Sequence, residues 1–335
     1  LECRVRGLVV RFVQLHVPDI AGREVQGRYG WVCGCGGCRH GPAVAVGERR
    51  VRQLVRHWFS ERVRGGAQSR PELETRGLRQ AVGDQPEVRH GAGGSCDEWV
   101  LAYKNRGAEL SDLTVFNGKV FTCDDRTGIV YELGPPGVRL RPRLLLVDGD
   151  GADASKGFKC EWMTVKDKKL YIGGLGKEWT TGKGDYVNDN PMFVKVVGVD
   201  GTVHHLSWKH VYVNIRASLG YDSPGYMVFE AVSYSSIKRR WFFLPRRVSK
   251  LRYDEHQDRE RGSNLLIETD QNFRVIRSIQ VGNHTPTRGF SSFKFIPGSG
   301  DNLILALRTE EIDDEHMKSY YIVFSVDGQV LIPET

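Results

Sequence analysis

The stretch of residues 113–133, LTVFNGKVFTCDDRTGIVYEL, contains three apolar runs separated by two turn sequences. Asn-Gly at residues 117–118 and Asp-Asp-Arg-Thr-Gly at residues 124–128 favour tight turns between antiparallel strands. The stretch therefore predicts three consecutive strands. The same layout returns in the segments EWMTVKDKKLYIGGLG, RWFFLPRR, FSSFKFIPGSGDNLILALRT and YYIVFSVDGQVLI.

This strand–turn–strand unit repeats along most of the chain. Residues 109–335 hold roughly four units of about fifty residues each, a period at which repeat architectures are found. Repeated four-stranded units of this length are more typical of a β-propeller than of a sandwich. Helical periodicity is weak, and only residues 207–219, SWKHVYVNIRASL, are expected to form a short helix or an irregular insertion. The sequence thus predicts an all-β propeller.

The composition changes abruptly near residue 99. Residues 1–100 contain 16 Arg and no Lys, whereas the remainder carries 17 Arg and 15 Lys. We therefore divide the chain into residues 1–98, an unassigned Arg- and Gly-rich segment, and residues 99–335, a β-propeller domain. A separate or disordered Arg-rich segment would explain the first part, and so would translation from a wrong reading frame, which we favour.

The cysteines give no strong signal of a metal site. Five of the seven lie in the first hundred residues. The C-x-C-x-x-C segment at residues 33–38, with His40, lacks the second ligand pair of a standard zinc site. Cys123 and Cys160 are interpreted as small apolar core residues, because the sequence alone cannot demonstrate a disulfide between them.

Composition also bounds the class of protein. A hydrophobic content of 40% indicates a globular chain, and no apolar run approaches the ~18 residues of a membrane-spanning helix. The net charge of +7 comes from scattered basic residues. A small anionic substrate accounts for such a distribution better than a nucleic acid does.

Four oxygen-bearing side chains recur once per unit. Ser111, Glu161, Glu230 and Ser291 are separated by 50, 69 and 61 residues, and each lies just before or inside an apolar stretch. One hard oxygen ligand per unit is what a radially repeated fold needs to hold a metal on its axis. The alternative is that the serines satisfy strand ends and the glutamates lie on solvated blade edges.

Several longer motifs resemble those of one enzyme family. They are, in order, ELSDLTVFNGKVF, DDRTGIVYEL, DGDG, KGFKCEW, LYIGGLGKEWTT, RWFFLPRR and GFSSFKFIP. Over about residues 109–335 they look like those of the calcium-activated nucleotidase (apyrase) family, which includes a vertebrate soluble enzyme and the salivary apyrases of blood-feeding arthropods. The resemblance implies a five-bladed β-propeller with a central Ca²⁺ that hydrolyses nucleoside di- and triphosphates such as UDP, GDP, ADP and ATP. It also implies axial ligand positions at Ser111, Glu161, Glu230 and Ser291.

Candidate catalytic residues lie in turns at a mouth of the propeller. Phosphoryl transfer needs an aligned water, a group that orients or deprotonates it, and positive charge on the phosphate oxygens. The candidates for the chemistry are Asp125, Arg126, Asp148, Asp150 and Glu178. The candidates for substrate binding, including arginines that clamp phosphates and tryptophans that stack on a base, are Asp124, Lys177, Trp179, Arg240, Trp241, Arg246 and Arg247. Each has a structural alternative, since DDRTG is a good turn sequence and a Trp that bounds a strand is usually core.

The chain departs from the family pattern at two places. Nothing in residues 1–98 matches the family strand close to IAVIADLD, and the chain stops at LIPET before a final strand that would supply a fifth ligand. We therefore expect an incomplete ring, with the first-blade and closing strands missing, and weak or absent activity. Ca²⁺-dependent hydrolysis of nucleoside di- and triphosphates is the leading expectation. The alternative is an impaired propeller that binds a nucleotide or a protein partner without turnover.

The cellular setting is also an expectation of the sequence. The triplet Asn283-His284-Thr285 matches the N-glycosylation acceptor pattern. It suits the secretory pathway, either the ER or Golgi lumen or secretion, although the first residues do not read as a signal segment. A homodimer is compatible with the sequence, which carries no signal of oligomeric state.

Overall fold

The computed structural model describes residues 2–5, 8–11, 108–134, 140–152, 154, 156–311 and 317–335. Before residue 108 it describes one two-stranded sheet, made of β1 (Glu2–Val5) and β2 (Leu8–Arg11). The predicted boundary near residue 99, and the interpretation of the Arg-rich segment apart from these two strands, lie outside the described residues.

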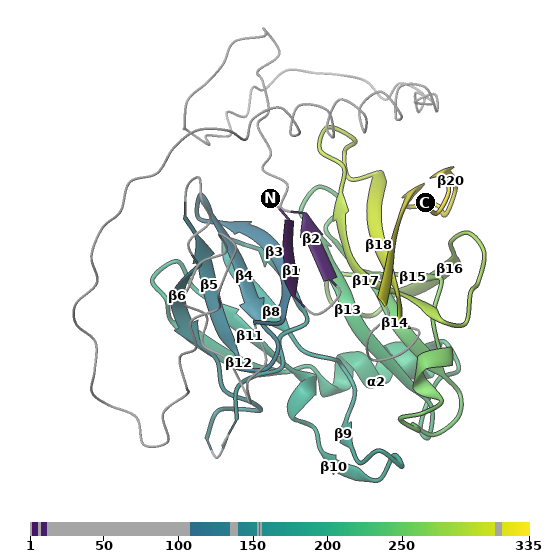
Figure 1. Ribbon diagram of the computed structural model, residues 1–335, viewed down its shortest axis with the longest axis horizontal. Helices are drawn as coiled ribbons and strands as arrows, with labels where there is room; N and C mark the ends of the chain where they lie inside the picture. Colours follow the sequence, from purple (N-terminus) through teal and green to yellow (C-terminus); the bar gives the residue numbers. More distant parts are fainter. Residues whose placement is uncertain are drawn as a thin grey trace, which may run out of the picture. The chain divides into compact units, whose positions relative to one another are not determined.

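Four four-stranded antiparallel sheets form the blades of a β-propeller (Figure 1). The first blade contains β3 (Leu110–Phe116), β4 (Lys119–Asp124), β5 (Ile129–Leu133) and β6 (Leu140–Leu145). The second contains β7 (Trp162–Lys166), β8 (Lys169–Gly173), β11 (Phe193–Val197) and β12 (Val203–Ser207). A hairpin of β9 (Trp179–Thr180) and β10 (Tyr186–Asn188), followed by the short η1 (Asn190–Met192), is inserted between β8 and β11.

The third and fourth blades follow the same plan. The third contains β13 (Tyr226–Ser235), β14 (Arg240–Ser249), β15 (Leu265–Asp270) and β16 (Ile276–Gln280), with η2 (Asp258–Glu260) before β15. The fourth contains β17 (Arg288–Phe295), β18 (Leu303–Glu311), β19 (Met317–Ser325) and β20 (Val330–Ile332). The predicted all-β propeller is confirmed to the extent of four blades within the described residues. The fifth blade that the resemblance implies is not among them.

Turn chemistry explains the first hairpin. Asn117 and Gly118 both have positive φ, 49° and 73°, and they connect the paired residues Phe116 and Lys119. Two left-handed residues in a two-residue loop match the right-handed twist of the flanking strands. The Asn-Gly turn predicted from the sequence is therefore confirmed.

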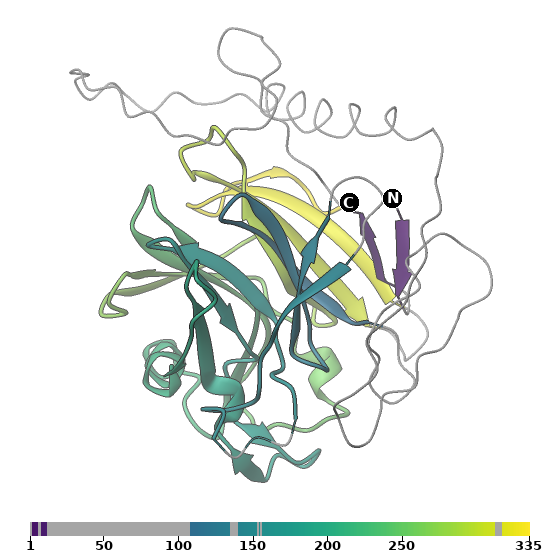
Figure 2. The same cartoon turned by 90° about the vertical axis from the view of Figure 1, so that its left-hand side faces the viewer.

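Strand direction decides which loops meet. Consecutive strands of an antiparallel blade alternate in direction. The starts of the inner strands β3, β7, β13 and β17, the turns after each second strand and the connections between blades therefore lie at one end, which we call the mouth end. Figure 2, turned by 90° from Figure 1, shows the blades as separate twisted sheets.

One helix, α2 (Lys209–Ser218), connects the second blade to the third at the mouth end. It confirms the helix expected within residues 207–219. Its buried residues include Val211, Tyr212 and Ile215, a spacing that places them on one face of the helix. No helix among the described residues has the length and apolar character needed to cross a membrane.

The core between the second and third blades is aromatic. Trp208 and Trp241 meet edge to face with ring centroids 5.0 Å apart, and Tyr212 stacks on Phe229 at 5.4 Å. Such pairs add to the free energy gained by burying their surface. We call the buried set the aromatic core; it consists of Trp162, Trp208, Tyr212, Phe229, Trp241 and Phe243.

A disulfide joins Cys123 to Cys160, which corrects their interpretation as separate small core residues. The Cα atoms lie 6.3 Å apart, within the usual range for a disulfide. Cys123 precedes Asp124 at the end of β4, and Cys160 precedes Glu161 at the start of β7. The bond therefore ties the end of β4 to the segment that leads into β7.

Candidate metal and nucleotide site

The four predicted axial ligands occupy similar places in the four blades. Ser111, Glu230 and Ser291 lie in the mouth-end half of β3, β13 and β17, and Glu161 immediately precedes β7. The backbone N–H of Glu161 still donates to the carbonyl of Gly173 on β8, at 2.8 Å. Each blade thus delivers one oxygen-bearing side chain from its innermost strand.

Three of these positions coincide with an irregularity in strand pairing. The register shifts around Ser111, around Glu230 and around Ser291, between the pairs Leu110/Leu113, Phe229/Ala231 and Phe290/Ser292. Bulges bend a strand and re-aim its side chains, and they occur frequently next to functional sites. Their recurrence at the predicted ligand positions supports a shared function for these residues.

Carboxylates from different blades approach one another at this level. Burial raises the pKa of the Glu161 carboxyl, and the charges of Glu230 and Asp125 raise it further, against the effect of Lys159. The ammonium Nζ of Lys159 lies 2.7 Å from Glu161 Oε1 and 2.6 Å from Asp125 Oδ2. A lysine thus holds together two carboxylates that would otherwise repel each other.

Arg246 connects the third blade to the fourth. Its guanidinium donates to Glu230, and its Nη2 lies 2.6 Å from Glu311 Oε1. The neighbouring Arg247 is 2% exposed and reaches Glu311 Oε2 at 3.3 Å. Arg246 and Arg247, two of the three predicted phosphate-binding arginines, are therefore at the mouth end, already paired with carboxylates. We call the central cluster the hub; it consists of Asp125, Lys159, Glu161, Glu230 and Arg246.

The turn after β4 presents Asp125 and Arg126, and Asp124 builds it. Asp124 Oδ1 accepts hydrogen bonds from the backbone N–H groups of Arg126 and Thr127, at 2.9 and 2.7 Å. Arg126 Nε lies 3.0 Å from Glu109 Oε2 and 3.6 Å from Asp125 Oδ1. Asp124 is 1% exposed, so its position fits the structural alternative rather than substrate contact.

A second group lies on the connection between the first and second blades. The buried carboxylate of Asp148 accepts from Asn190 Nδ2 at 3.1 Å and lies 3.3 Å from Lys156 Nζ. The same Lys156 Nζ stands over the half-buried Trp179 ring, 4.2 Å from its centroid. Asp150 is exposed and accepts the backbone N–H of Ala152. The structure thus brings Asp148 and Trp179 to the same lysine, and Asp150 caps its own loop.

The predicted residues Lys177 and Glu178 are held within the inserted hairpin. The two oxygens of Glu178 accept from the guanidinium of Arg216 on α2, at 2.9 and 2.7 Å. Lys177 Nζ donates to the carbonyl of Glu178 and to the hydroxyl of Thr180. Desolvation lowers the pKa of Lys177 to about 8. These contacts fix the hairpin against the helix.

Two predicted substrate-binding residues lie away from the mouth. Arg240 is the first residue of β14, six positions before Arg246, and pairs with Glu268 at 3.1 Å. Six residues of strand span about 20 Å, so the two arginines cannot clamp one phosphate. Trp241 belongs to the aromatic core and is 1% exposed, which leaves no face for a nucleobase.

Sequence reasoning missed two members of the charged network. Lys159 lies two residues before Glu161, but both precede β7, so strand alternation gave no signal that they face one another. Glu311 ends β18 and gave no such signal, because its partners Arg246 and Arg247 come from another blade.

The donor set at the hub fits Ca²⁺. Among the described residues no group of three or more His, Cys, Asp or Glu side chains is arranged around one metal position. Lys159 does bring the carboxylates of Asp125 and Glu161 together, and the hydroxyl of Ser111 donates to the carbonyl of Cys160, the residue before Glu161, at 2.8 Å. Hard oxygens from carboxylates, hydroxyls and carbonyls are the ligands that Ca²⁺ prefers.

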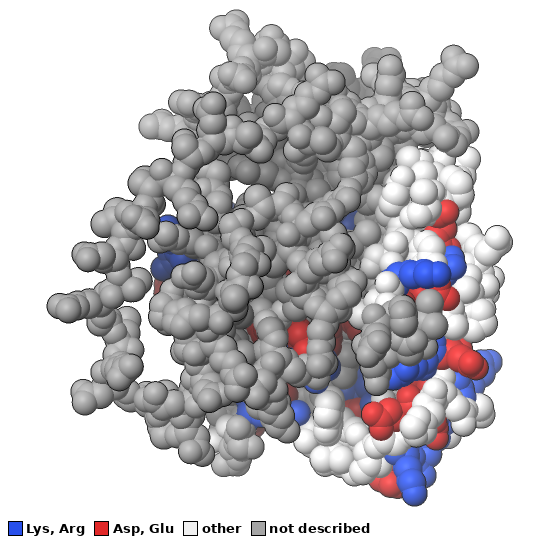
Figure 3. Space-filling view, viewed as in Figure 1, with Lys and Arg blue, Asp and Glu red and all other residues white. Residues whose placement is uncertain are grey.

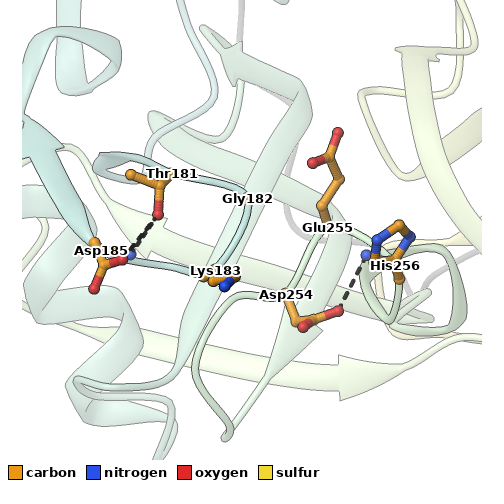
Figure 4. A pocket seen from close by; sticks show the side chains of 7 residues that line it. All are labelled: Thr181, Gly182, Lys183, Asp185, Asp254, Glu255 and His256. Carbon is orange, nitrogen blue, oxygen red and sulfur yellow. Dashed lines mark hydrogen bonds between the residues drawn. The ribbon is translucent and has the colours of Figure 1, made fainter.

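A separate, open pocket of about 530 Å³ lies between the inserted hairpin and the loop after β14 (Figure 4). It is lined by Thr181, Gly182, Lys183, Asp185, Asp254, Glu255 and His256. Thr181 and Asp254 are occupied in capping the backbone of their own loops. The pocket contains none of the predicted site residues.

Comparison with known proteins identifies a family with similar sequences. The family model for apyrase matches residues 97–335. The chain is 52% identical over 235 residues to soluble calcium-activated nucleotidase 1 of Rattus norvegicus, covering 70% of this chain and 57% of the rat protein. It is 47% identical to an apyrase of Caenorhabditis elegans and 44% identical to an apyrase of Cimex lectularius, again over 70% of this chain and over 65% and 64% of those proteins. The chain thus spans less than two thirds of the length of these relatives.

The matched region contains all four blades and every predicted site residue, as the motif resemblance implied. The chain belongs to the apyrase family.

Proposed function

We propose that this protein uses Ca²⁺ to hydrolyse the terminal phosphate of nucleoside di- and triphosphates. The observation that carries the proposal is geometric: each blade presents one oxygen-bearing side chain on or just before its inner strand, and three of the four lie at a register shift. The charge of Glu230 also raises the pKa of Glu161. A divalent cation between them would relieve this repulsion. The printed names of the relatives, a calcium-activated nucleotidase and apyrases, support the same activity.

In this proposal Ser111, Glu161, Glu230 and Ser291 hold the cation at the axis of a five-bladed ring. Bound Ca²⁺ supplies positive charge to the phosphate oxygens and orients the substrate. The hydroxyl of Thr309 donates to the hydroxyl of Ser291 at 2.9 Å and thereby orients it. The four described blades are part of this ring.

The charged residues in and around the hub have different roles in the proposed reaction. Asp125, held by Lys159, orients the attacking water and accepts its proton. Arg126, Arg246 and Arg247 bind the phosphate oxygens after their ion pairs with the neighbouring carboxylates have opened. Trp179 stacks on the base at the entrance. Glu178 and Lys177 position the hairpin that carries Trp179 and do not enter the chemistry.

A second function, binding without turnover, is favoured by one observation. Lys159, Arg126 and Arg246 each lie within ion-pair distance of a carboxylate, so the site is neutralised internally. A substrate phosphate has to compete with those carboxylates for the cations. If the carboxylates kept their cationic partners, the protein would bind Ca²⁺ or nucleotide without releasing phosphate.

One experiment separates the two functions. Phosphate release from UDP, GDP, ADP and ATP is measured for the full chain in Ca²⁺, in Mg²⁺ and in a chelator, beside the Glu161→Gln/Glu230→Gln variant. Release that depends on Ca²⁺ and is lost in the variant supports hydrolysis. Ca²⁺ binding by calorimetry without any release supports the binding function, and absence of both overturns the proposal.

We also propose that the protein works in the secretory pathway, in the ER or Golgi lumen or outside the cell. The Cys123–Cys160 disulfide supports this, because such bonds persist in oxidising compartments. Lys and Arg are interspersed with Asp and Glu on the surface shown in Figure 3, which suits a small anionic substrate better than a nucleic acid. Fractionation of expressing cells tests the compartment, and sedimentation tests whether the chain forms a homodimer.

A further inference from the structure

Asp112, next to the predicted ligand Ser111, joins three blades through one carboxylate. Its Oδ2 accepts the backbone N–H of Met163 on β7 at 2.9 Å. Its Oδ1 accepts the hydroxyl of Ser292 on β17 at 3.2 Å. Lys294 of the same strand approaches both oxygens at 2.9 Å. Asp112 itself lies on β3 and is 5% exposed, so its carboxylate is largely shielded from water, whereas the Lys294 side chain is 45% exposed.

The partners of Asp112 are adjacent to predicted cation ligands. Met163 lies two residues after Glu161, and Ser292 directly follows Ser291. The carboxylate therefore connects the three inner strands at the level where Ser111, Glu161 and Ser291 leave them. A displacement of either partner strand by one ångström would move a ligand oxygen by a similar amount.

The fourth inner strand is attached to this network through Thr164. Its Oγ1 accepts the backbone N–H of Tyr234 on β13 at 3.0 Å and lies 3.3 Å from the hydroxyl of Ser233. Thr164 is the residue after Met163, whose N–H is bound by Asp112. Hydrogen bonds therefore link β17 to β3, β3 to β7 and β7 to β13, with the backbone of Met163 and Thr164 joining the last two links.

We propose that Asp112 is a positioning residue that sets the spacing of the inner strands and thereby the Ca²⁺ affinity of the hub. This inference rests on the proposed function, because it assumes that the hub binds Ca²⁺. Asp112 is not itself a ligand. Its Oδ1 also accepts the backbone N–H of Leu113 at 2.8 Å, so both oxygens are already occupied by donors.

The role follows from the chemistry of the carboxylate. Asp112 accepts from two backbone N–H groups, a hydroxyl and an ammonium, which a negative acceptor with two oxygens can satisfy together. An amide at this position would turn one acceptor into a donor and place an N–H against another donor. Because ligands must be held within about half an ångström of a productive geometry, loss of this link weakens cation binding before it affects the ligands themselves.

The test compares three variants of the full chain. Asp112→Asn removes the charge and one acceptor. Ser292→Ala/Lys294→Met keeps the carboxylate and releases β17 alone. Asp200→Asn is the matched control, because Asp200 also accepts a backbone N–H and a hydroxyl, both from Thr202, but in the turn between β11 and β12 at the far end of the second blade.

Three measurements are made on each variant: the Ca²⁺ dissociation constant by calorimetry, hydrogen exchange of the Met163 amide without Ca²⁺, and phosphate release as a function of Ca²⁺. For Asp112→Asn we expect a dissociation constant about tenfold higher, in line with the loss of one charged hydrogen bond. We expect at least tenfold faster Met163 exchange, and a kcat within about twofold of wild type at saturating Ca²⁺. The Ser292→Ala/Lys294→Met variant should weaken Ca²⁺ binding severalfold and leave Met163 exchange slow.

The outcomes separate this inference from the proposed function. If Asp112→Asn binds Ca²⁺ as tightly as wild type, or no more weakly than Asp200→Asn does, this inference is overturned and the proposed function is not affected. Weakened Ca²⁺ binding in Asp112→Asn, with no phosphate release by any form, supports the inference and overturns hydrolysis. A wild-type chain that binds no Ca²⁺ overturns both.

Discussion

The hub and the aromatic core occupy neighbouring parts of the second and third blades and are built in opposite ways. The hub brings charged groups together, whereas the rings of the aromatic core pack with one another and with aliphatic side chains such as Val194 and Ile215. The start of β7 and the middle of β13 supply residues to both regions. Glu161 precedes Trp162, and Phe229 precedes Glu230, with each member of a pair assigned to a different region.

The difference shows how a single strand divides structural and chemical tasks. Trp162 and Phe229 pack in the aromatic core, whereas their neighbours Glu161 and Glu230 pair with Lys159 and Arg246. At Glu230 a shift in strand register separates the two directions. Trp162 and Phe229 are fully buried and stabilise the blades that position Glu161 and Glu230. Stability and function should therefore respond separately to neighbouring substitutions.

The largest expected effect is the loss of stability on removing a core ring. Trp241→Ala should lower the free energy of unfolding by about 3–5 kcal/mol, because it leaves a cavity among the rings of Trp208, Tyr234 and Phe273. Urea denaturation measures this. The Ca²⁺ affinity of the folded fraction should stay unchanged, and a parallel loss of affinity would show that the two regions are not separable.

Next comes the loss of a hub carboxylate. Glu161→Gln should weaken Ca²⁺ binding about 100-fold, or about 2.7 kcal/mol, because an anionic ligand is replaced by a neutral one. Its unfolding free energy in a chelator should stay within about 1 kcal/mol of wild type, since a repulsive charge is also removed. Titration calorimetry measures the affinity. Glu132→Gln, which removes a carboxylate paired with Lys119 and Arg143 on the first blade, is the control and should bind Ca²⁺ normally.

A smaller effect is expected where a predicted catalytic residue has a structural role. Glu178→Gln leaves the buried guanidinium of Arg216 with a neutral partner. Glu178 is about one quarter exposed, so the loss is screened and should amount to about 1–2 kcal/mol of unfolding free energy. Thermal denaturation measures it. A hundredfold fall in kcat with normal stability would instead restore Glu178 to the chemistry.

The smallest effect is expected at Arg240. Its ion pair with Glu268 is partly exposed, and such pairs contribute about 0–1 kcal/mol. Arg240→Ala should therefore change the unfolding free energy by no more than about 0.5 kcal/mol and leave the KM for nucleotide unchanged. Steady-state kinetics measures the KM of Arg240→Ala in parallel with that of Arg246→Ala, for which a change is expected. A tenfold rise in KM for Arg240→Ala would contradict its placement at the far end of β14.

Local patterns predicted the elements well and the neighbours of individual residues poorly. The Asn117–Gly118 turn and helix α2 follow from short-range preferences that tertiary contacts did not override. Trp241 and Arg246 share the motif RWFFLPRR, yet one lies in the aromatic core and the other in the hub. Adjacency in a motif carries no information on depth, which depends on strand direction and on the blade that packs alongside.

By itself the sequence determined the repeated strand units, the all-β class and the family, because these depend on periodicity and on residue types at short spacing. Only the tertiary structure decided which charges meet. The approach of Glu161 to Glu230, the pairing of Arg246 with Glu311 and the link from Asp112 to Met163 join residues from different blades. The physical reason is that such contacts depend on how blades close around an axis and on the bulges that aim their side chains, and neither leaves a local pattern in the chain.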